Sequence, residues 1–287
     1  MDNIFSVDVE DWYQGLEIDM DHWQGFTPRI EAGLLLLLDL LREAGTPATF
    51  FVLGFQAERT PDLVRQIAAA GHEIASHGWS HRFVYRQPPE EFRRELRRSK
   101  EMLEQIAGRP VKGYRAPFFS ITACSLWALD ILVEEGFSYD SSVFPVFNYR
   151  YGIPGASRLP GWIRTPCGGK LFEIPLSTVR IPAASSRRGL NLPLGGGGYF
   201  RLYPYAVTRL LTRQLVQREK QRLVFYVHPW EYDPDHPRIL LPRWLPGRTH
   251  YMNLTSTHRK TCCLLRDFRF TTMRAAFGDQ WTSAPPP

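Results

Sequence analysis

Two histidines and an acidic cluster carry the strongest chemical signal in this chain of 287 residues. His77 and His81 stand four residues apart, and the sequence Asp8-Val9-Glu10-Asp11 lies close to the amino terminus. Neutral imidazoles combined with one carboxylate suit a borderline divalent cation, and zinc is the ion that we expect. Three protein ligands leave one coordination position open for water, as in catalytic rather than structural metal sites. The sequence therefore predicts a hydrolase.

The geometry of an extended strand divides the acidic cluster between two faces. Side chains alternate along a strand, so Asp8 and Glu10 point the same way and Asp11 points the other way. Carboxylates are costly to bury without a partner, which favours a functional role for two of them on one face. Glu10 and Asp11 also fit an exposed turn, and an isolated His-x-x-x-His pair is often structural. Only the joint occurrence of the two motifs favours a metal site.

Three further residues strengthen the prediction of a site. Arg115 lies beside a turn stiffened by Pro117, Asp140 follows a helix, and His228 comes at the carboxyl end of the apolar strand 224–227. Functional residues of parallel α/β folds collect at the carboxyl edge of the sheet, which favours His228 as a site residue. Taken singly, each also has a structural interpretation: a surface arginine, a helix-capping aspartate and a core histidine.

Strand and helix patterns alternate along the chain. Runs of β-branched and aromatic residues predict strands, and apolar residues at helical spacing predict helices bounded by proline and glycine. The expected strands are 4–9, 48–54, 72–75 and 223–227, and the expected helices are 30–44, 61–70, 89–107 and 125–135. This alternation predicts an α/β fold with a mainly parallel sheet, open or closed into a barrel.

The segment 144–204 breaks the alternation. It is rich in proline, glycine, serine and arginine, and it contains four consecutive glycines, Gly195 to Gly198. No Lys-Ser/Thr follows these glycines, which argues against a phosphate-binding loop. We expect a long loop that covers or lines a substrate groove.

Composition sets the class of protein. Hydrophobic residues make up 44% and charged residues 22% of the chain, which is typical of a globular domain, and the net charge is +6. Nothing pairs the basic residues with a nucleic-acid motif, so no nucleic-acid partner is expected. The four cysteines form no Cys-x-x-Cys pair, no signal peptide is apparent, and the apolar run 34–41 is too short to cross a membrane. We therefore expect a cytoplasmic location.

Taken together, these motifs resemble those of the NodB-homology polysaccharide deacetylases. The matching segments are, in chain order, Asp8-Val9-Glu10, Ala48-Thr49-Phe50-Phe51, His77-x-x-x-His81, Arg115-x-Pro117-Phe118, Asp140-Ser141-Ser142 and the strand before His228. The resemblance spans 3–232, and the later segments 196–201 and 228–234 resemble the subgroup found beside exosortase/PEP-CTERM exopolysaccharide gene clusters. It implies a distorted (β/α) barrel that forms one catalytic domain over 1–287, with a subgroup-specific carboxyl-terminal extension over 233–283.

The resemblance also implies the metal ligands. His77, His81 and one carboxylate would hold a divalent ion, which would polarise the acetamide carbonyl and activate water. Many relatives carry adjacent aspartates in the first motif and others carry Asp-x-Asp, and strand alternation places Glu10 at the second aspartate of the latter pattern. Glu10 is therefore the expected ligand, whereas a β-bulge at the strand end would select Asp11. The other histidines, His250 among them, are expected to be structural or exposed.

Catalytic roles follow from the same resemblance. Asp8 would act as the general base on water, and Arg115 would pair with Asp8 and keep it ionised. His228 would donate a proton to the departing amine, and Asp140 would orient or charge His228. A backbone N–H near Phe118 would help to bind the oxyanion.

The expected reaction is removal of N-acetyl groups from amino sugars of an exopolysaccharide or its precursor. The substrate would be an N-acetylated polysaccharide or a lipid-linked oligosaccharide, and a partner could recruit the protein to a membrane-bound polysaccharide synthesis complex. One alternative keeps the metal but hydrolyses a small cyclic amide or ureide, as allantoinase-like relatives do. Another is a non-catalytic carbohydrate-binding module, although Asp8, Arg115 and His228 would be needed for turnover rather than for binding.

Overall fold

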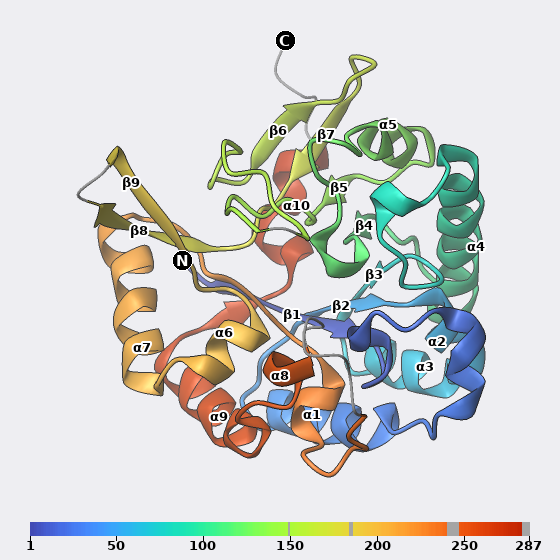
Figure 1. The fold of residues 1–287 in the computed structure, drawn as a ribbon, viewed down its shortest axis with the longest axis horizontal. Coiled ribbons are helices and arrows are strands. Elements are labelled where there is room, and N and C mark those ends of the chain that lie inside the picture. Colours follow the sequence, from blue (N-terminus) through green and yellow to red (C-terminus); the bar gives the residue numbers. More distant parts are fainter. Residues whose placement is uncertain (149, 184–185, 240–246, 283–287) are drawn as a thin grey trace.

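A curled sheet of nine strands forms the centre of the molecule (Figure 1). The computed structural model describes residues 1–148, 150–183, 186–239 and 247–282. The strands of this sheet are β1 (Asn3–Val9), β2 (Thr49–Val52), β3 (Glu73–Ser76), β4 (Gly113–Tyr114), β5 (Tyr139–Asp140), β6 (Gly161–Arg164), β7 (Lys170–Glu173), β10 (Val224–Val227) and β11 (Phe270–Thr271). Their order is β10-β1-β2-β3-β4-β5-β7-β6, with β11 also paired to β1, and only the β6–β7 pair is antiparallel.

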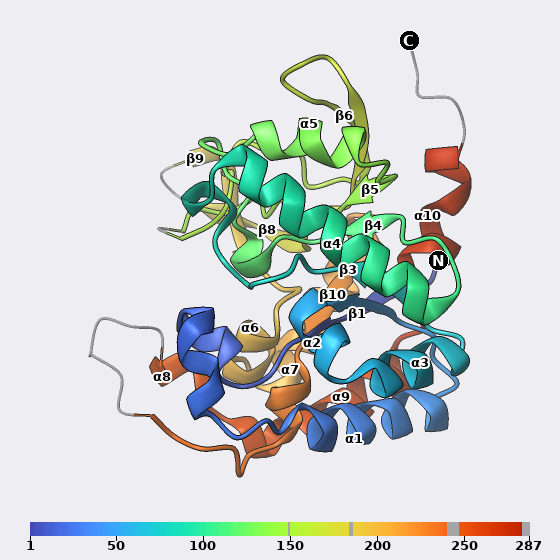
Figure 2. The same cartoon turned by 90° about the vertical axis from the view of Figure 1, so that its right-hand side faces the viewer.

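Helices cover the outside of the curl and fill the crossovers between parallel strands (Figures 1 and 2). They are α1 (Ile30–Glu43), α2 (Gly54–Arg59), α3 (Pro61–Ala69), α4 (Pro89–Ala107), α5 (Trp127–Glu134), α6 (Gly197–Leu202), α7 (Tyr205–Arg213), α8 (Gly247–His250), α9 (Thr257–Asp267) and α10 (Met273–Thr282). The ends of the sheet order, β6 and β10, are not paired with each other in the described part of the chain. The architecture is therefore the expected α/β fold, an incomplete and distorted (β/α) barrel.

The predicted elements before residue 136 and the strand before His228 are confirmed within two residues at most ends. The longest helix, α4, shows why. Pro89 begins it, where a missing N–H costs nothing, and Gly108 ends it in the left-handed conformation at φ 63°. The buried positions Phe92, Leu96 and Leu103 lie on one face of the helix and turn toward the sheet.

Strand β1 separates two environments through its alternating side chains. Phe5 and Val7 pack in the apolar layer between the sheet and the outer helices. Ser6 and Asp8 point to the inside of the curl, where their side chains meet groups from other strands. This alternation places polar chemistry inside the barrel and hydrophobic packing outside it.

The expectation of a long loop over 144–204 is wrong. Besides β6 and β7, this segment contains the separate antiparallel hairpin β8 (Thr178–Ala183) and β9 (Ser186–Pro193), which projects from one side in Figure 1. Their composition hides these strands, because β9 carries Gly, Asn and Arg and is not a buried apolar run. The glycines that follow serve close packing, since a Cβ on Gly195 would collide with the carbonyl oxygen of Val224 in β10.

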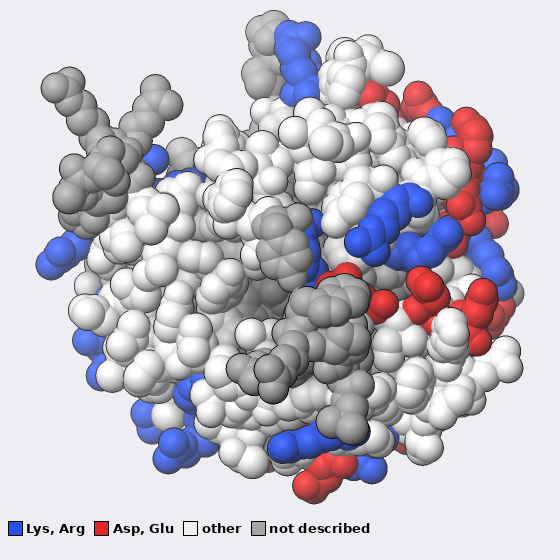
Figure 3. Space-filling view, in the orientation of Figure 1, with Lys and Arg blue, Asp and Glu red and all other residues white. Residues whose placement is uncertain are grey.

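Charged side chains around α4 are paired with one another and do not form a patch of one sign. Arg82 contacts Glu91 and Glu95, while Arg93 contacts Glu134 and Glu135. In Figure 3 red and blue side chains are interspersed on this side of the molecule. The described helices include none with both the length and the apolar character of a membrane span.

Candidate active site

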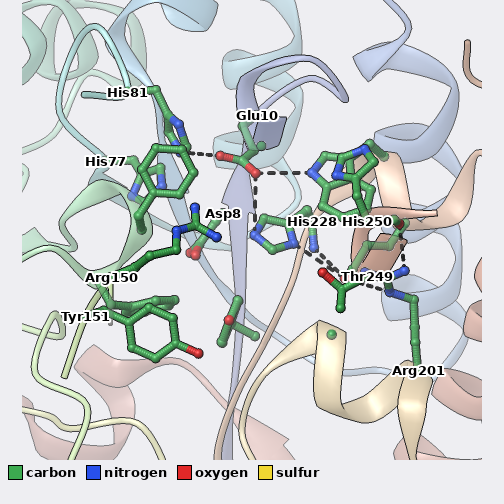
Figure 4. Close-up of a pocket in the computed structure, with 17 residues that line it drawn as sticks. Asp8, Glu10, His77, His81, Arg150, Tyr151, Arg201, His228, Thr249 and His250 are labelled. Atoms are coloured by element: carbon green, nitrogen blue, oxygen red, sulfur yellow. Dashed lines mark hydrogen bonds and ion pairs between the residues drawn. The ribbon is translucent and has the colours of Figure 1, made fainter. Parts of the chain in front are cut away.

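The carboxyl ends of the parallel strands deliver five of the predicted site residues to one cavity (Figure 4), and Arg115 and Asp140 are not among the residues that line it. Asp8 and Glu10 come from the end of β1, His77 follows β3, and His228 follows β10. His81 completes the group from the loop after His77, with its backbone in the left-handed conformation at φ 52°. Such a conformation is strained for a side chain of this kind and is found mainly where function requires it.

Glu10, His77 and His81 form a compact cluster at the inner end of the cavity. Their potential ligand atoms all lie within 4.8 Å of one another, and all three side chains are buried. Asp11 lies outside this cluster: its Oδ2 accepts the N–H groups of Arg29, at 2.9 Å, and Ile30, at 3.2 Å, where α1 begins. The strand alternation therefore continues through Glu10, and the geometry favours Glu10 over Asp11 as a ligand.

The chemistry of the cluster fits a divalent metal ion. Nδ1 of His77 lies 2.8 Å from the carbonyl oxygen of Arg115 and donates to it, which leaves Nε2 of His77 with a free lone pair. Oε2 of Glu10 lies against Nε2 of His81 without a hydrogen bond of accepted geometry between them, and Nδ1 of His81 is buried with no hydrogen-bond partner among the described residues. Buried polar atoms without partners require an explanation, and a cation held between them supplies one.

Electrostatics in the cluster favour the protonation states that a metal needs. Burial lowers the pKa of His77 to about 4, so its ring is neutral near pH 7. Burial raises the pKa of Glu10, but the surrounding histidines outweigh that effect and hold it well below its usual range. The cluster therefore offers a neutral imidazole at His77 and an ionised carboxylate at Glu10, which are the forms that bind metals.

Asp8 forms an ion pair with Arg115 inside the barrel. Nη1 of Arg115 donates to Oδ1 of Asp8 at 2.6 Å and to Oγ of Ser6 at 2.9 Å. Ser141 accepts from the same guanidinium through its carbonyl oxygen and its hydroxyl, and the ring of Phe51 lies 4.0 Å away. Arg115 is thus an interior residue rather than a surface one, and its charge stabilises the Asp8 carboxylate.

His228 lies between two carboxylates. Its Nε2 is 3.5 Å from Oε1 of Glu10, and its Nδ1 is 3.6 Å from Oε2 of Glu231. Burial alone would lower the pKa of His228, but the facing carboxylates outweigh it and raise the pKa to about 9. The ring stacks on Trp230, with centroids 5.0 Å apart, and Trp230 donates its indole N–H to Glu10 at 3.1 Å.

The contacts of Asp140 differ from the contact with His228 that was expected. This residue ends β5, in register with Tyr114 of β4 and Glu173 of β7, while β1 to β4 separate β5 from β10 along the sheet. Its Oδ1 accepts the hydroxyl of Ser142 at 2.6 Å, and the same hydroxyl accepts the backbone N–H of Ala116 at 2.8 Å. Asp140 therefore supports the chain next to Arg115, and the second carboxylate that faces His228 belongs to Glu231.

Sequence reasoning missed Glu231, Arg201 and His250, which line the same cavity. Glu231 stands three residues after His228, at the spacing of a helix capping box, and this is the one local signal that could have identified it. His250 was expected to be structural or exposed; it is buried, stacks on Trp230 with centroids 3.9 Å apart and lines the cavity. Its position depends on tertiary packing that a single sequence does not reveal.

Two family models match the chain. Residues 30–132 match the family described as polysaccharide deacetylase, and residues 141–278 match a domain of unknown function, DUF3473. Neither match includes Asp8 or Glu10. The first contains His77, His81 and Arg115, and the second contains His228 and the three residues that the sequence reasoning missed.

Curated relatives agree with the first match. A peptidoglycan-N-acetylglucosamine deacetylase from Bacillus cereus is 32% identical over 40% of this chain and 44% of its own length. A chitooligosaccharide deacetylase from Rhizobium leguminosarum bv. trifolii is 38% identical over 28% of this chain and 39% of its own length. The chain thus spans less than half of the length of these relatives. Together, the family model and the relatives support the polysaccharide deacetylase family.

The fold is shared over the whole chain with a solved structure from Mycobacterium smegmatis, described as a candidate polysaccharide deacetylase. That structure superposes with a TM-score of 0.61 at 23% identity, covering 100% of this chain and 93% of the other. The comparison confirms the distorted (β/α) barrel that the sequence predicts.

Proposed function

We propose that this protein is a metal-dependent N-deacetylase that hydrolyses the acetamido group of an amino sugar in a polysaccharide or lipid-linked oligosaccharide. One observation carries the proposal. A single cavity holds a three-ligand cluster suited to a cation, a carboxylate paired with a buried arginine, and an imidazole set between carboxylates. Metal-dependent hydrolysis of an amide uses these three functions: a Lewis acid, a base for water and an acid for the leaving amine.

Each group in the cavity has a separate role in the proposed reaction. Glu10, His77 and His81 would hold a divalent ion, which would polarise the acetamide carbonyl and acidify water. Asp8 removes a proton from the attacking water, and Arg115 keeps Asp8 ionised and oriented for that step. His228 gives a proton to the sugar nitrogen as the C–N bond breaks, so that acetate and a neutral amine are released.

Both matched segments contribute to the cavity, which supports one catalytic domain over 1–287. The first contributes His77 and His81, and the second contributes Arg201, His228 and His250. Part of the proposed extension 233–283 belongs to the site through His250, whereas 240–246 and 283 lie outside the described residues.

The relatives named above act on peptidoglycan N-acetylglucosamine and on chitooligosaccharides, which are both N-acetylated amino-sugar polymers. That shared chemistry supports an N-acetylated sugar as the substrate. The segments 196–201 and 228–234, which resemble the exosortase-associated subgroup, lie within the DUF3473 match and border the cavity. They favour an exopolysaccharide or its precursor as the polymer. Two imidazoles and one carboxylate as ligands favour zinc as the ion.

Metal content and acetate release test the proposal together. The purified protein should contain one divalent ion per chain and release acetate from N-acetylated chitooligosaccharides or from a bacterial exopolysaccharide that contains N-acetylhexosamine. A chelator should abolish release, and added zinc should restore it. His77→Ala should remove both the ion and the activity. Hydrolysis of a cyclic ureide without acetate release from any sugar would overturn the proposal, and so would a protein that takes up no metal.

A further inference from the structure

The carboxylate of Glu231 is buried next to His228 and has protein partners on two sides. Its side chain is fully buried. Oε1 accepts Nε of Arg201 at 2.8 Å, while Oε2 accepts the backbone N–H of His228 at 3.0 Å. The same Oε2 lies 3.6 Å from Nδ1 of the His228 ring. One carboxylate therefore contacts both the backbone and the ring side of the proposed acid.

The guanidinium of Arg201 is hydrogen-bonded to this carboxylate and to backbone carbonyl oxygens nearby. It is 2% exposed, and its Nη1 donates to the carbonyl oxygens of His250, at 2.8 Å, and Met252, at 2.7 Å. The side chain of Asn253 donates in turn to the carbonyl oxygen of Arg201 at 3.1 Å. These contacts leave the guanidinium no freedom to follow a substrate, so its charge serves to hold Glu231 in place.

The glycine run provides the space that the pair requires. A Cβ on Gly197, at the start of α6, would collide with both carboxylate oxygens of Glu231. The next glycine, Gly198, lines the cavity together with Arg201 and Glu231. The absence of a side chain at Gly197 therefore allows α6 to bring Arg201 close to Glu231.

We propose that Glu231, fixed by Arg201, is the positioning residue that orients His228 so that Nδ1 faces Glu231 and Nε2 faces the reacting amide. This inference rests on the proposed deacetylase function. Nε2 is the ring nitrogen on the side of Glu10, 3.5 Å from its Oε1, and therefore on the side of the metal cluster. Glu231 selects the ring nitrogen that delivers the proton and offsets the charge of the imidazolium before transfer, as the third member of a catalytic triad does.

Glu231→Gln tests this role, because the amide keeps the size of the side chain and removes its charge. The variant should release acetate from N-acetylated chitooligosaccharide with kcat lowered about 100-fold or more, with KM within about threefold of wild type and with unchanged metal content. Hydrolysis of 4-nitrophenyl acetate should change by less than about threefold, because 4-nitrophenolate leaves without a proton. Arg201→Lys should also lower kcat on the amide, but by less than Glu231→Gln does. If Glu231→Gln does not fold, Arg201→Lys is measured in its place.

Glu73→Gln is the matched control. Glu73 is another buried glutamate, at the opposite end of the barrel, where it accepts from Thr49 and Tyr139. Its substitution should lower stability and leave kcat within about threefold. A Glu231→Gln protein with wild-type kcat on the amide, with equal losses on amide and ester, or with lost metal would overturn the positioning role. A wild-type protein that releases no acetate would instead overturn the proposed function.

Discussion

Arg115 and Asp8 form an ion pair across the inside of the barrel, with Nη1 2.6 Å from Oδ1 and both side chains buried. Asp8 comes from β1 and Arg115 follows β4, and β2 and β3 lie between these strands in the sheet. The pair therefore spans the interior of the curl and does not join neighbouring strands. It contributes both to the cohesion of the barrel and to the state of the proposed base.

Arg115→Met should destabilise the protein and abolish acetate release, because it leaves Asp8 buried without its cation. Breaking a buried pair in this way costs about 3–5 kcal/mol of unfolding free energy. Urea denaturation followed by circular dichroism measures the loss. Arg42→Met breaks the exposed pair with Asp39 and serves as the control, with little expected change. Equal stability of the two variants would contradict the interpretation of Arg115.

Glu10→Gln and Asp11→Asn should separate the two candidate carboxylate ligands. Glu10 belongs to the cluster with His77 and His81, whereas Asp11 accepts backbone N–H groups at the start of α1. Glu10→Gln should lose the bound ion and the activity, whereas Asp11→Asn should retain the ion and show only a modest loss of stability. Metal analysis of both purified variants decides the question. The assignment would be reversed if Asp11→Asn alone lost the ion.

Stability should fall on acidification through His72, which lies away from the cavity. Its Nδ1 accepts the backbone N–H of Ala48 at 3.1 Å, and burial lowers its pKa from 6.5 to about 4. Between about pH 6.5 and pH 4 the unfolded chain therefore binds a proton at His72 that the folded chain does not. The unfolding free energy must decrease as the pH is lowered through this window, and the contribution is constant above it.

His72→Asn places Oδ1 near the position of Nδ1 and removes the titration. Its unfolding free energy should depend less steeply on pH than that of the wild type between pH 6.5 and pH 4. Urea titrations at several pH values across this window measure both slopes. Parallel profiles for the two proteins would show that His72 does not contribute.

Alanine at two helical glycines should change stability in opposite directions. A Cβ on Gly33 of α1 would collide with the carbonyl oxygen of Pro229, whereas one on Gly278 of α10 meets only Cγ of Arg274, at 3.6 Å. Gly33→Ala should cost about 1–3 kcal/mol through overpacking. Gly278→Ala should add up to about 1 kcal/mol through helix propensity. Thermal unfolding of both variants gives the signs, and a stabilising Gly33→Ala would refute the close packing of α1 on the chain after His228.

Much of the site was predictable because strand geometry fixes where side chains point. His77 and Glu10 follow short, well-patterned strands, so the alternation and the carboxyl-edge rule place them correctly. The partner of His228 was not predictable in this way. Asp140 and Glu231 both stand near the ends of strands, so either could have been the partner of His228. Glu231 is the one that α6 supports, because Arg201 of this helix donates to its carboxylate. The strands within 144–204 were missed because they are short or interrupted by proline and glycine, so no continuous apolar or alternating run marks them.

The position of β1 between β2 and β10 has a consequence for folding during synthesis on the ribosome. Val7 pairs with Phe50 on one side and with Val227 on the other, so one edge of β1 has no neighbour until more than two hundred further residues have been synthesised. Contacts so distant in sequence form slowly, and an unpaired strand edge can associate with other chains. A ribosome-bound chain of about 140 residues already contains Glu10, His77 and His81 but lacks His228 and Glu231. The capacity to bind an ion would thus precede the capacity for turnover, and the nascent chain would depend on rapid completion or on chaperones to protect β1.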